Sequence, residues 1–459
     1  MARRQRPGDM TPGGRPVGMD MTHGKLWRQI LRFSVPLMLG NLLQQLYSAA
    51  DAAVVGNLVG SGALAAVGMS LPMTVIALGF LMGMSSGASA VTARAFGSSD
   101  RRAMDNAIHT AMALAVTLGA AISVGGFFAT GALLRLMHTP PEVFADALTY
   151  FRIFFAGILA ASVYNMGAAI LNAFGETRKP MQFLIISSAL NITLDLLFVI
   201  VLHLGVAGVA LATLTAQTVS AALMLRALMR AKLPCNLKPR GIRFDVTTLK
   251  EIMRIGLPVG AERLINGVTN IMLQTYINGL GAAYVAGWGV VSNLDAFVYM
   301  LSGAVALSVI TCVGQNLGAG QPERARRGVK TALVICVSAT LTVSAVMLAL
   351  NVRVLRVLTP DEDVLAAAFT FMRVLTATYW IDGFVIIFSD ALAGAGRALT
   401  ATVINTVTHV GVRQAYLFAI SKLWYTPTAV ALCYPLAWAL SIAALLIVYR
   451  RDDWTRFRR

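Results

Sequence analysis

The sequence carries little charge for its length. Asp, Glu, Lys and Arg make up 13% of its 459 residues, whereas soluble domains carry about 25%. Hydrophobic residues make up 57%, which leaves too little polar surface to coat soluble globules. The composition also excludes disorder away from the chain ends, because disordered chains are poor in hydrophobic residues. Apolar runs of about 20 residues or more remain, and such runs predict membrane-spanning helices.

Signals of enzymes and of cofactor binding are also missing. The chain has no G-x-x-x-x-G-K-[ST] motif for nucleotide phosphates. An intramembrane enzyme would need a histidine or a serine with its base at depth, and His409 stands alone there. The four cysteines follow no metal or redox spacing; they are Cys235, Cys312, Cys336 and Cys433. We therefore expect no enzyme and no cofactor.

Hydropathy and helix-breaking residues predict twelve membrane spans. Helices rise 1.5 Å per residue, so about 20 to 26 residues cross a hydrocarbon core of about 30 Å with some tilt. The predicted spans are 32–57, 63–93, 107–131, 151–174, 181–203, 206–226, 255–280, 284–314, 331–351, 371–396, 400–421 and 428–449.

The basic residues collect on one side of these spans. Of the 38 Lys and Arg residues, 30 lie in the N-terminal stretch, the even-numbered loops and the C-terminal stretch. By the positive-inside rule, both termini are cytoplasmic, and we expect a plasma (bacterial inner) membrane. The net charge of +17 then reflects topology and attraction to anionic lipid headgroups. Because no basic motif interleaved with aromatic residues is present, we expect no nucleic-acid partner.

The chain contains two copies of one six-helix unit. The sequence LRFSVPL at 31–37 matches MRIGLPV at 253–259, an offset of 222, and four further pairs of short motifs keep an offset of 220 to 222. Six is an even number, so both copies enter the membrane from the same side. Parallel repeats of this kind place a substrate at their interface and alternate its access between the two sides. A two-lobed transporter follows from the repeat alone.

The predicted fold class is an all-α membrane protein with twelve transmembrane helices in two parallel six-helix lobes. The expected domains are a disordered cytoplasmic tail (1–24), an N-lobe (25–230), a cytoplasmic linker (231–250), a C-lobe (251–450) and a basic cytoplasmic tail (451–459).

Several short motifs, in order and at fixed spacing, resemble those of the multidrug and toxin extrusion (MATE) family. They are Gln44-Gln45-Leu46-Tyr47, Asp51, Val55-Gly56, Ala65-Ala66-Val67-Gly68, Gly83 to Gly87, Ala95-Phe96-Gly97, LNAFGETRKP at 171–180, Gly256-Leu257-Pro258, GQNLG at 314–318 and AGAG at 393–396. The resemblance covers residues 30–449. It departs at Arg397-Ala398, where an acidic residue and Thr are more usual. The resemblance implies the MATE-type fold and multidrug efflux, and hence a role in antibiotic resistance.

Eight ionisable residues fall within the predicted spans. Each costs several kcal/mol in lipid, about 3 at a helix centre, unless it is paired, neutralised or facing water. Such residues mark an ion or substrate pathway or form a structural ion pair. They are Asp51, Asp195, Glu262, Arg263, Asp295, Asp382, Asp390 and Arg413.

Four polar residues of the N-lobe are expected to meet in the outer half of the membrane. Asp51 lies nineteen residues into its helix from Arg32, and Asp195 lies sixteen residues from Lys179. Asn191 is one turn from Asp195 on the same face, and Thr213 on the sixth helix lies at a similar depth. Two carboxylates close together in low dielectric cannot both stay charged cheaply, so the pair can carry a proton. The same oxygens could hold Na⁺ instead.

The resemblance adds roles for these and other residues. The DNA-damage-inducible branch of the family, which the chain resembles, uses a helix 1 Asp with an Asn and an Asp four apart on helix 5, and Asp51, Asn191 and Asp195 match that pattern. Glu262 and Asp382 match acidic positions of the sodium-coupled branch. They form a second cation site or, neutralised by Arg263 or Arg413, a structural pair. The expected substrate-binding residues are Gln44, Tyr47, Asn165, Asn172 and Asp295. Independently of the resemblance, Pro36 and Pro258 break the hydrogen-bond ladders of their helices, so they are expected to be hinges or static kinks kept for packing.

The predicted function is secondary antiport. The protein is expected to export organic compounds, cationic or amphipathic, in exchange for protons or sodium, by alternating access between two lobes. The alternative is a flippase or exporter of lipid-linked precursors or other metabolites in the same superfamily, which would carry several arginines in its cavity to grip pyrophosphate. The expected partners are small-molecule substrates and the lipid bilayer, and we expect a monomer.

Overall fold

The computed structural model describes residues 18–54, 70–230, 233–350, 352–356, 359–451 and 454–455, without the side chains of 46–54 and 70–76. These ranges are helical and contain no strand. The first six spans are α1 (Leu26–Val54), α3 (Ser70–Gly97), α4 (Arg101–Leu136), α5 (Pro141–Ala173), α6 (Arg178–Leu196) with the π-helical turn η3 (Leu197–Val201), and α7 (Gly205–Arg230).

The second six spans follow a short connection that contains the 3-10 turn η4 (Pro239–Gly241). They are α8 (Val246–Asn278), α9 (Ala282–Gly318), α10 (Pro322–Leu350), α12 (Glu362–Gly394), α13 (Ala398–Thr406) with η5 (Val407–Val412) and α14 (Arg413–Leu423), and α15 (Pro427–Ala431) with α16 (Cys433–Arg451). The short helix α11 (Val352–Arg356) follows α10. The twelve predicted spans and two lobes are confirmed. Several helices run longer than predicted, because hydropathy detects only the part of a helix that lies in hydrocarbon.

Eight of the described spans are long and apolar enough to cross a membrane by composition. They are α4, α5, α6 with η3, α7, α9, α10, α12, and α15 with α16. Neither α8 nor the segment from α13 to α14 is among them. These two spans carry Glu262, Arg263 and Arg413 between apolar residues. Polar residues at such depth require a water-filled or protein-lined surface, and both spans line the cavity described below.

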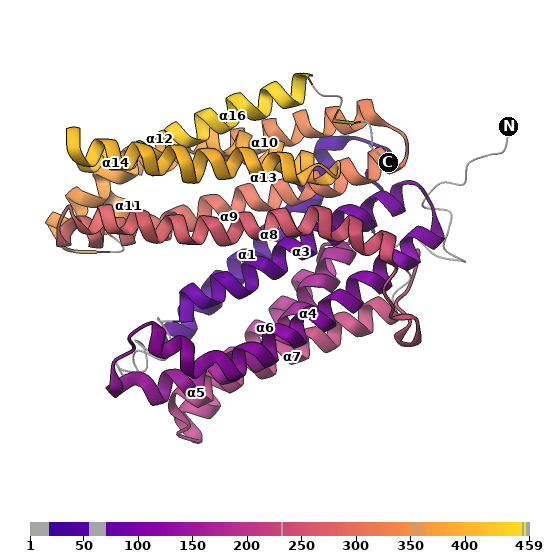
Figure 1. Ribbon diagram of the computed structural model, residues 1–459, viewed down its shortest axis with the longest axis horizontal. Coiled ribbons are helices and arrows are strands. Elements are labelled where there is room, and N and C mark those ends of the chain that lie inside the picture. The colour runs from indigo at the N-terminus through magenta and orange to yellow at the C-terminus, as the bar shows by residue number, and fades with distance from the viewer. Residues whose placement is uncertain are drawn as a thin grey trace.

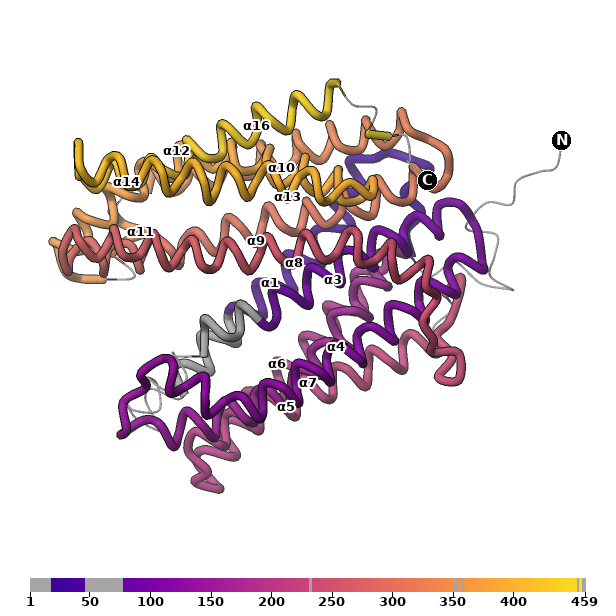
Figure 2. Tube along the Cα trace, viewed as in Figure 1, coloured from indigo at the N-terminus to yellow at the C-terminus, as the bar shows by residue number. Residues whose placement is uncertain are grey.

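The two lobes meet at one end and diverge toward the other (Figure 1). The end at which they meet is the one where α1 begins and α16 ends. There α3 packs along α8 (Figure 2) and also contacts α9, and glycines bring its backbone into contact with both helices. A Cβ atom added at Gly83 would lie 2.3 Å from the Cα atom of Gly260, and one at Gly97 would lie 1.9 Å from the carbonyl oxygen of Gln315. Small residues allow this close approach of helices in membranes.

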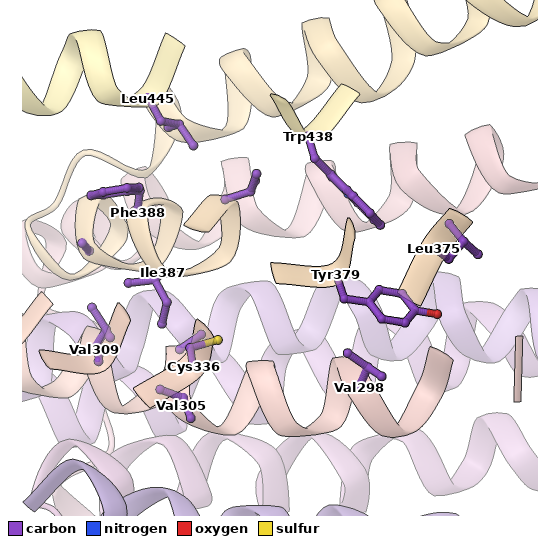
Figure 3. Close-up of a cluster of buried hydrophobic side chains, with 14 of the residues drawn as sticks. Val298, Val305, Val309, Cys336, Leu375, Tyr379, Ile387, Phe388, Trp438 and Leu445 are labelled. Atoms are coloured by element: carbon purple, nitrogen blue, oxygen red, sulfur yellow. The ribbon is translucent and has the colours of Figure 1, made fainter. Parts of the chain in front are cut away.

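Each lobe has its own apolar core. In the C-lobe, Val305 and Val309 of α9, Tyr379 of α12 and Trp438 of α16 belong to one buried cluster (Figure 3). The N-lobe cluster extends across the closed end, where it includes Ile310 of α9. The lobes are therefore joined by apolar packing as well as by the glycine contacts.

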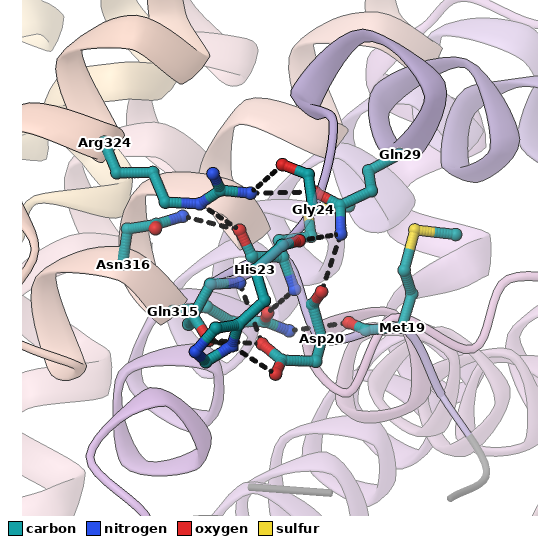
Figure 4. A network of polar contacts seen from close by, with 10 residues as sticks. Met19, Asp20, His23, Gly24, Gln29, Gln315, Asn316 and Arg324 are labelled. Carbon is teal, nitrogen blue, oxygen red and sulfur yellow. Dashed lines mark hydrogen bonds and ion pairs between the residues drawn. The ribbon is translucent and has the colours of Figure 1, made fainter. Parts of the chain in front are cut away.

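Residues 18–24 cross from one lobe to the other at the closed end (Figure 4). The Met21 side chain is fully buried, and its amide donates to Oε1 of Gln315 at 2.8 Å. Its carbonyl accepts from Nδ2 of Asn316 at 3.2 Å and Nε of Arg324 at 3.1 Å. On the N-lobe side, the Met19 amide donates to the Phe174 carbonyl at 3.0 Å.

The disordered tail predicted over 1–24 therefore differs from the structure in its last part. Residues 18–24 are ordered, whereas residues 1–17 lie outside the described residues. Polar composition suggested disorder, but it does not reveal the buried amides on α9 that hold this segment. We call residues 18–24 the N-terminal clasp.

Gln315→Leu is expected to weaken the clasp. The Gln315 side chain accepts from the Met21 amide and donates to the Ala173 carbonyl at 2.8 Å. A leucine of similar size leaves both buried groups without a partner, at a cost of about 2–5 kcal/mol. Thermal unfolding in detergent should show a lower midpoint. Gln182→Leu, which replaces an exposed glutamine on α6, is the control, and equal midpoints in the two variants would contradict the prediction.

The connection between the lobes is docked onto α4. The Lys238 amide donates to Nε2 of His109 at 3.0 Å, and the Asp245 amide donates to Oγ1 of Thr110 at 3.0 Å. Burial raises the pKa of the Cys235 thiol to about 11, with a hydrogen bond to Asp105 as a further cause. Cys235 is therefore protonated and unreactive at neutral pH.

Candidate functional site

A cavity of about 860 Å³ lies between the two lobes. Its walls come from α1, α3 and α5 of the N-lobe and from α8, α9, α12, α13, η5, α14 and α16 of the C-lobe. Its volume falls in the range of small-molecule sites, about 300–1,000 Å³. Because the lobes are joined at the end where α1 begins, the cavity is closed toward that end by the α3–α8 contact.

The two walls of the cavity differ in charge. Among the described residues, the N-lobe wall carries neutral polar groups: Asn41, Ser85, Ser86, Ser89, Asn165 and Asn172. The ionisable side chains are on the C-lobe wall: Glu262, Arg263, Asp295, Asp382, Asp390, His409 and Arg413. A ligand that reaches across the cavity therefore meets amides and hydroxyls on one side and charges on the other.

Two polar stripes at helical spacing form much of the charged wall. On α8, Glu262, Asn266, Asn270 and Gln274 follow one another at four-residue intervals and all line the cavity. The span from α13 to α14 contributes Thr402, Asn405, His409 and Arg413 at intervals of three or four. Residues at this spacing share one helix face. The stripes are visible in the sequence, but our predictions named only their ionisable members and not the amides and the hydroxyl between them.

The Glu262 carboxylate is held by neutral donors. Its Oε2 accepts from Oγ1 of Thr402 at 3.0 Å and its Oε1 from Nδ2 of Asn405 at 2.9 Å. Nδ2 of Asn405 also donates to Oγ of Ser389 at 3.0 Å. No ion pair with Arg263 or Arg413 forms within the described part of the chain. Glu262 is therefore held in place by these hydrogen bonds, and the charge of Arg263 acts on it without a direct ion pair.

Asp295 and Asp382 form a second acidic group in the cavity. Asp295 lies on α9 and Asp382 on the neighbouring helix α12, close enough for their charges to interact. The Asp382 side chain is buried. Two carboxylates in a low-dielectric site repel each other, and a shared proton or small cation relieves the repulsion.

The N-lobe cluster is only partly within the described side chains. Asn191 and Asp195 are each 1% exposed and lie one turn apart on α6. Nδ2 of Asn191 donates to Oγ1 of Thr213 on α7 at 3.4 Å. Asp51 is on α1, which packs along α6, but its side chain lies outside the described residues, as does that of Tyr47. The described members of this cluster do not line the main cavity.

The remaining predicted residues are distributed unevenly. Asn165, Asn172 and Asp295 line the cavity, whereas Gln44 is exposed on α1 and does not line it. Pro36 and Pro258 lie within α1 and α8, and both helices continue past them. The role of these prolines as hinges remains a prediction. The cavity residues that we did not predict include Asn270, Trp288, Tyr299, Asn405, Tyr434 and Trp438.

Comparisons with known proteins agree with this architecture. The MatE family model matches residues 36–197 and 258–416, one match in each lobe. The probable multidrug resistance protein YpnP of Bacillus subtilis shares 26% identity over 95% of this chain and 97% of its own. The FAD transporter of Shewanella oneidensis shares 27% identity over 82% of this chain and 84% of its own.

A solved structure shares the fold. It is described as the outward-facing conformation of a multidrug resistance MATE family transporter of the MOP superfamily, and it aligns with a TM-score of 0.89 at 23% identity. The alignment covers 96% of this chain and 99% of that one.

Proposed function

We propose that this chain, which belongs to the MatE (multidrug and toxin extrusion) family of membrane transporters, exports organic compounds in exchange for protons or sodium ions. The observation that carries the proposal is the cavity between the lobes, which holds four carboxylates on its C-lobe wall. Its expected substrates are cationic or amphipathic, and the name of the Bacillus subtilis relative, a probable multidrug resistance protein, supports export of several organic compounds. Both termini are proposed to be cytoplasmic, so the cavity is closed on the cytoplasmic side.

Competition at the carboxylates is sufficient for antiport. A carboxylate that holds a cationic substrate cannot hold a proton, and a bound proton or sodium ion weakens the attraction for the substrate. If the lobes rearrange only when one of the two is bound, outward movement of substrate is coupled to inward movement of the ion. The rearrangement must part α3 from α8, which touch through glycines.

The coupling ion is proposed to bind in the N-lobe. Asn191 and Thr213 are already joined, and Asp195 is buried one turn away. Asp51 would complete the set from α1. A charge change there would act on the α1–α6 contact, and Pro36 would let α1 bend in response. Glu262 and Asp382 are proposed as cation-binding residues of the C-lobe.

A metabolite or lipid-precursor exporter is the second candidate. Two observations favour it: Arg263 and Arg413 line the cavity, and one relative is a FAD transporter. Four carboxylates on the same wall oppose it, because a pyrophosphate would meet more negative than positive charge. Binding of FAD more tightly than of cationic dyes by the purified protein would favour this candidate.

Dye export should depend on an imposed ion gradient. Vesicles that contain the purified protein and are loaded with ethidium should export it when a proton or a sodium gradient is applied, and the two are applied separately to identify the ion. Dissipating the effective gradient should return export to the rate of protein-free vesicles. Export that continues without either gradient would overturn the antiport mechanism.

A further inference from the structure

Within the described part of the chain, the Arg413 guanidinium is a buried cation without a carboxylate partner. Arg413 begins α14, its side chain is 5% exposed, and it lines the cavity. Its Nη2 donates to Oδ1 of Asn270 at 3.1 Å, and its Cζ lies 5.2 Å from the centre of the Tyr434 ring. Its Nε has no hydrogen-bond partner, and no ion pair to Asp or Glu forms among the described residues.

Two of the four acidic residues of the cavity, Glu262 and Asp390, are engaged with other groups, and the other two form the Asp295–Asp382 group described above. Glu262 accepts from Thr402 and Asn405. The charge of Arg263 acts on Glu262 and Asp390. Neutral partners such as Asn270 and the Tyr434 ring give the guanidinium a hydrogen bond and a ring contact, but they do not neutralise its charge. A buried ion without an opposite charge is costly. No described carboxylate pairs with Arg413, so the anionic group of a bound ligand would neutralise its charge.

An aromatic platform adjoins the guanidinium. The Tyr434 ring stacks on Trp288 with centroids 5.9 Å apart and planes at 26°, and it contacts Trp438 at 5.5 Å. All three residues line the cavity, although the Trp438 side chain is only 3% exposed. A flat aromatic ligand gains by stacking on such rings, and the guanidinium beside them offers a planar fork that matches a carboxylate.

We propose that Arg413, Asn270 and the Tyr434–Trp288 pair form a subsite for the carboxylate of an aromatic zwitterion. The positively charged end of the same ligand would face the Asp295–Asp382 group. This inference rests on the proposed export function and narrows its substrate class, from cations in general to aromatic compounds that carry both charges. A purely cationic analogue leaves Arg413 unpaired and binds less well.

Rhodamine 110 and rhodamine 123 are a matched pair of probes for this subsite. They share one cationic ring system, and rhodamine 110 carries a free carboxylate where rhodamine 123 carries its methyl ester. Binding to purified protein is measured by fluorescence polarisation for the wild type, Arg413→Gln and Arg413→Lys. Lys422→Gln is the control, since Lys422 lies on the same helix and its amine stands over the Phe418 ring, outside the cavity.

Arg413→Gln should weaken rhodamine 110 binding by about tenfold or more and change rhodamine 123 binding by less than about threefold. Arg413→Lys keeps the charge but loses the fork, so it should restore part of the affinity. Equal weakening of both dyes, or no weakening of rhodamine 110, would overturn the subsite. If Arg413→Gln does not fold, the wild type decides: rhodamine 110 must bind at least as tightly as its ester.

The same dyes separate this inference from the proposed function. Wild-type vesicles that export neither dye under an ion gradient count against export itself. Wild-type vesicles that export rhodamine 123 but do not accept rhodamine 110 leave the export function standing and overturn the anion subsite.

Discussion

Asp195→Asn is expected to reduce dye export to the rate of vesicles without protein. Asparagine has nearly the same shape as aspartate, but it cannot take up a proton or balance the charge of a sodium ion. Asp195 is 1% exposed on α6, one turn from Asn191, whose amide donates to Thr213. Losing the ionisable group there removes the ion that drives transport. Export from vesicles under proton and sodium gradients measures the effect.

The variant must be shown to be folded before its loss of export is interpreted. Ser187→Ala is a matched control, because Ser187 is also buried on α6 and donates to the Ala216 carbonyl at 2.9 Å. It should keep most of the export rate. If Asp195→Asn exports dye as the wild type does, the coupling site lies elsewhere.

Asp382→Asn is expected to lower export by about 5- to 150-fold, the change in affinity that corresponds to a typical coupling free energy between two binding sites. Asp382 on α12 and Asp295 on the neighbouring helix α9 are close enough for their charges to interact, so a proton or cation on one affects the other. Neutralising Asp382 removes the repulsion between the two carboxylates. A shared proton or cation is then no longer needed to relieve that repulsion. Initial export rates over a range of dye concentrations show whether substrate affinity or turnover is lost.

Asp363→Asn is the control for this variant. Asp363 is an exposed acidic residue in the first turn of the same helix, so its replacement removes one negative charge far from the cavity. If Asp382→Asn exports dye at the wild-type rate, the acidic residues of the C-lobe have a structural role and do not bind the ion.

The architecture was predictable because its causes are local. A span is visible as a run of apolar residues, and the two lobes are visible because LRFSVPL at 31–37 recurs as MRIGLPV at 253–259. The exceptions have a physical reason. The α8 span is weakly apolar because it faces the cavity, and residues 18–24 are ordered by partners on α9 about 295 positions away.

The site was predictable only where one helix defines it. Asn191 and Asp195 share a face because they are four residues apart, and the depth estimate placed Thr213 near them, as the structure does. The Glu262 contacts join residues 140 and 143 positions apart, and no periodicity of a single helix reveals such pairs. The position of the Asp51 side chain relative to Asp195 stays a prediction.

The N-terminal clasp has a consequence for the speed of the proposed cycle. Its backbone is bonded to α5 through Phe174 and to α9 and α10 through Gln315, Asn316 and Arg324. Opening the closed end, which is proposed to be cytoplasmic, must pull the buried Met21 side chain out of its pocket, and that work adds to the barrier between the two states. In the proposed cycle, the dwell time of the state closed at this end is then set partly by the seven residues of the clasp, which belong to neither helical repeat.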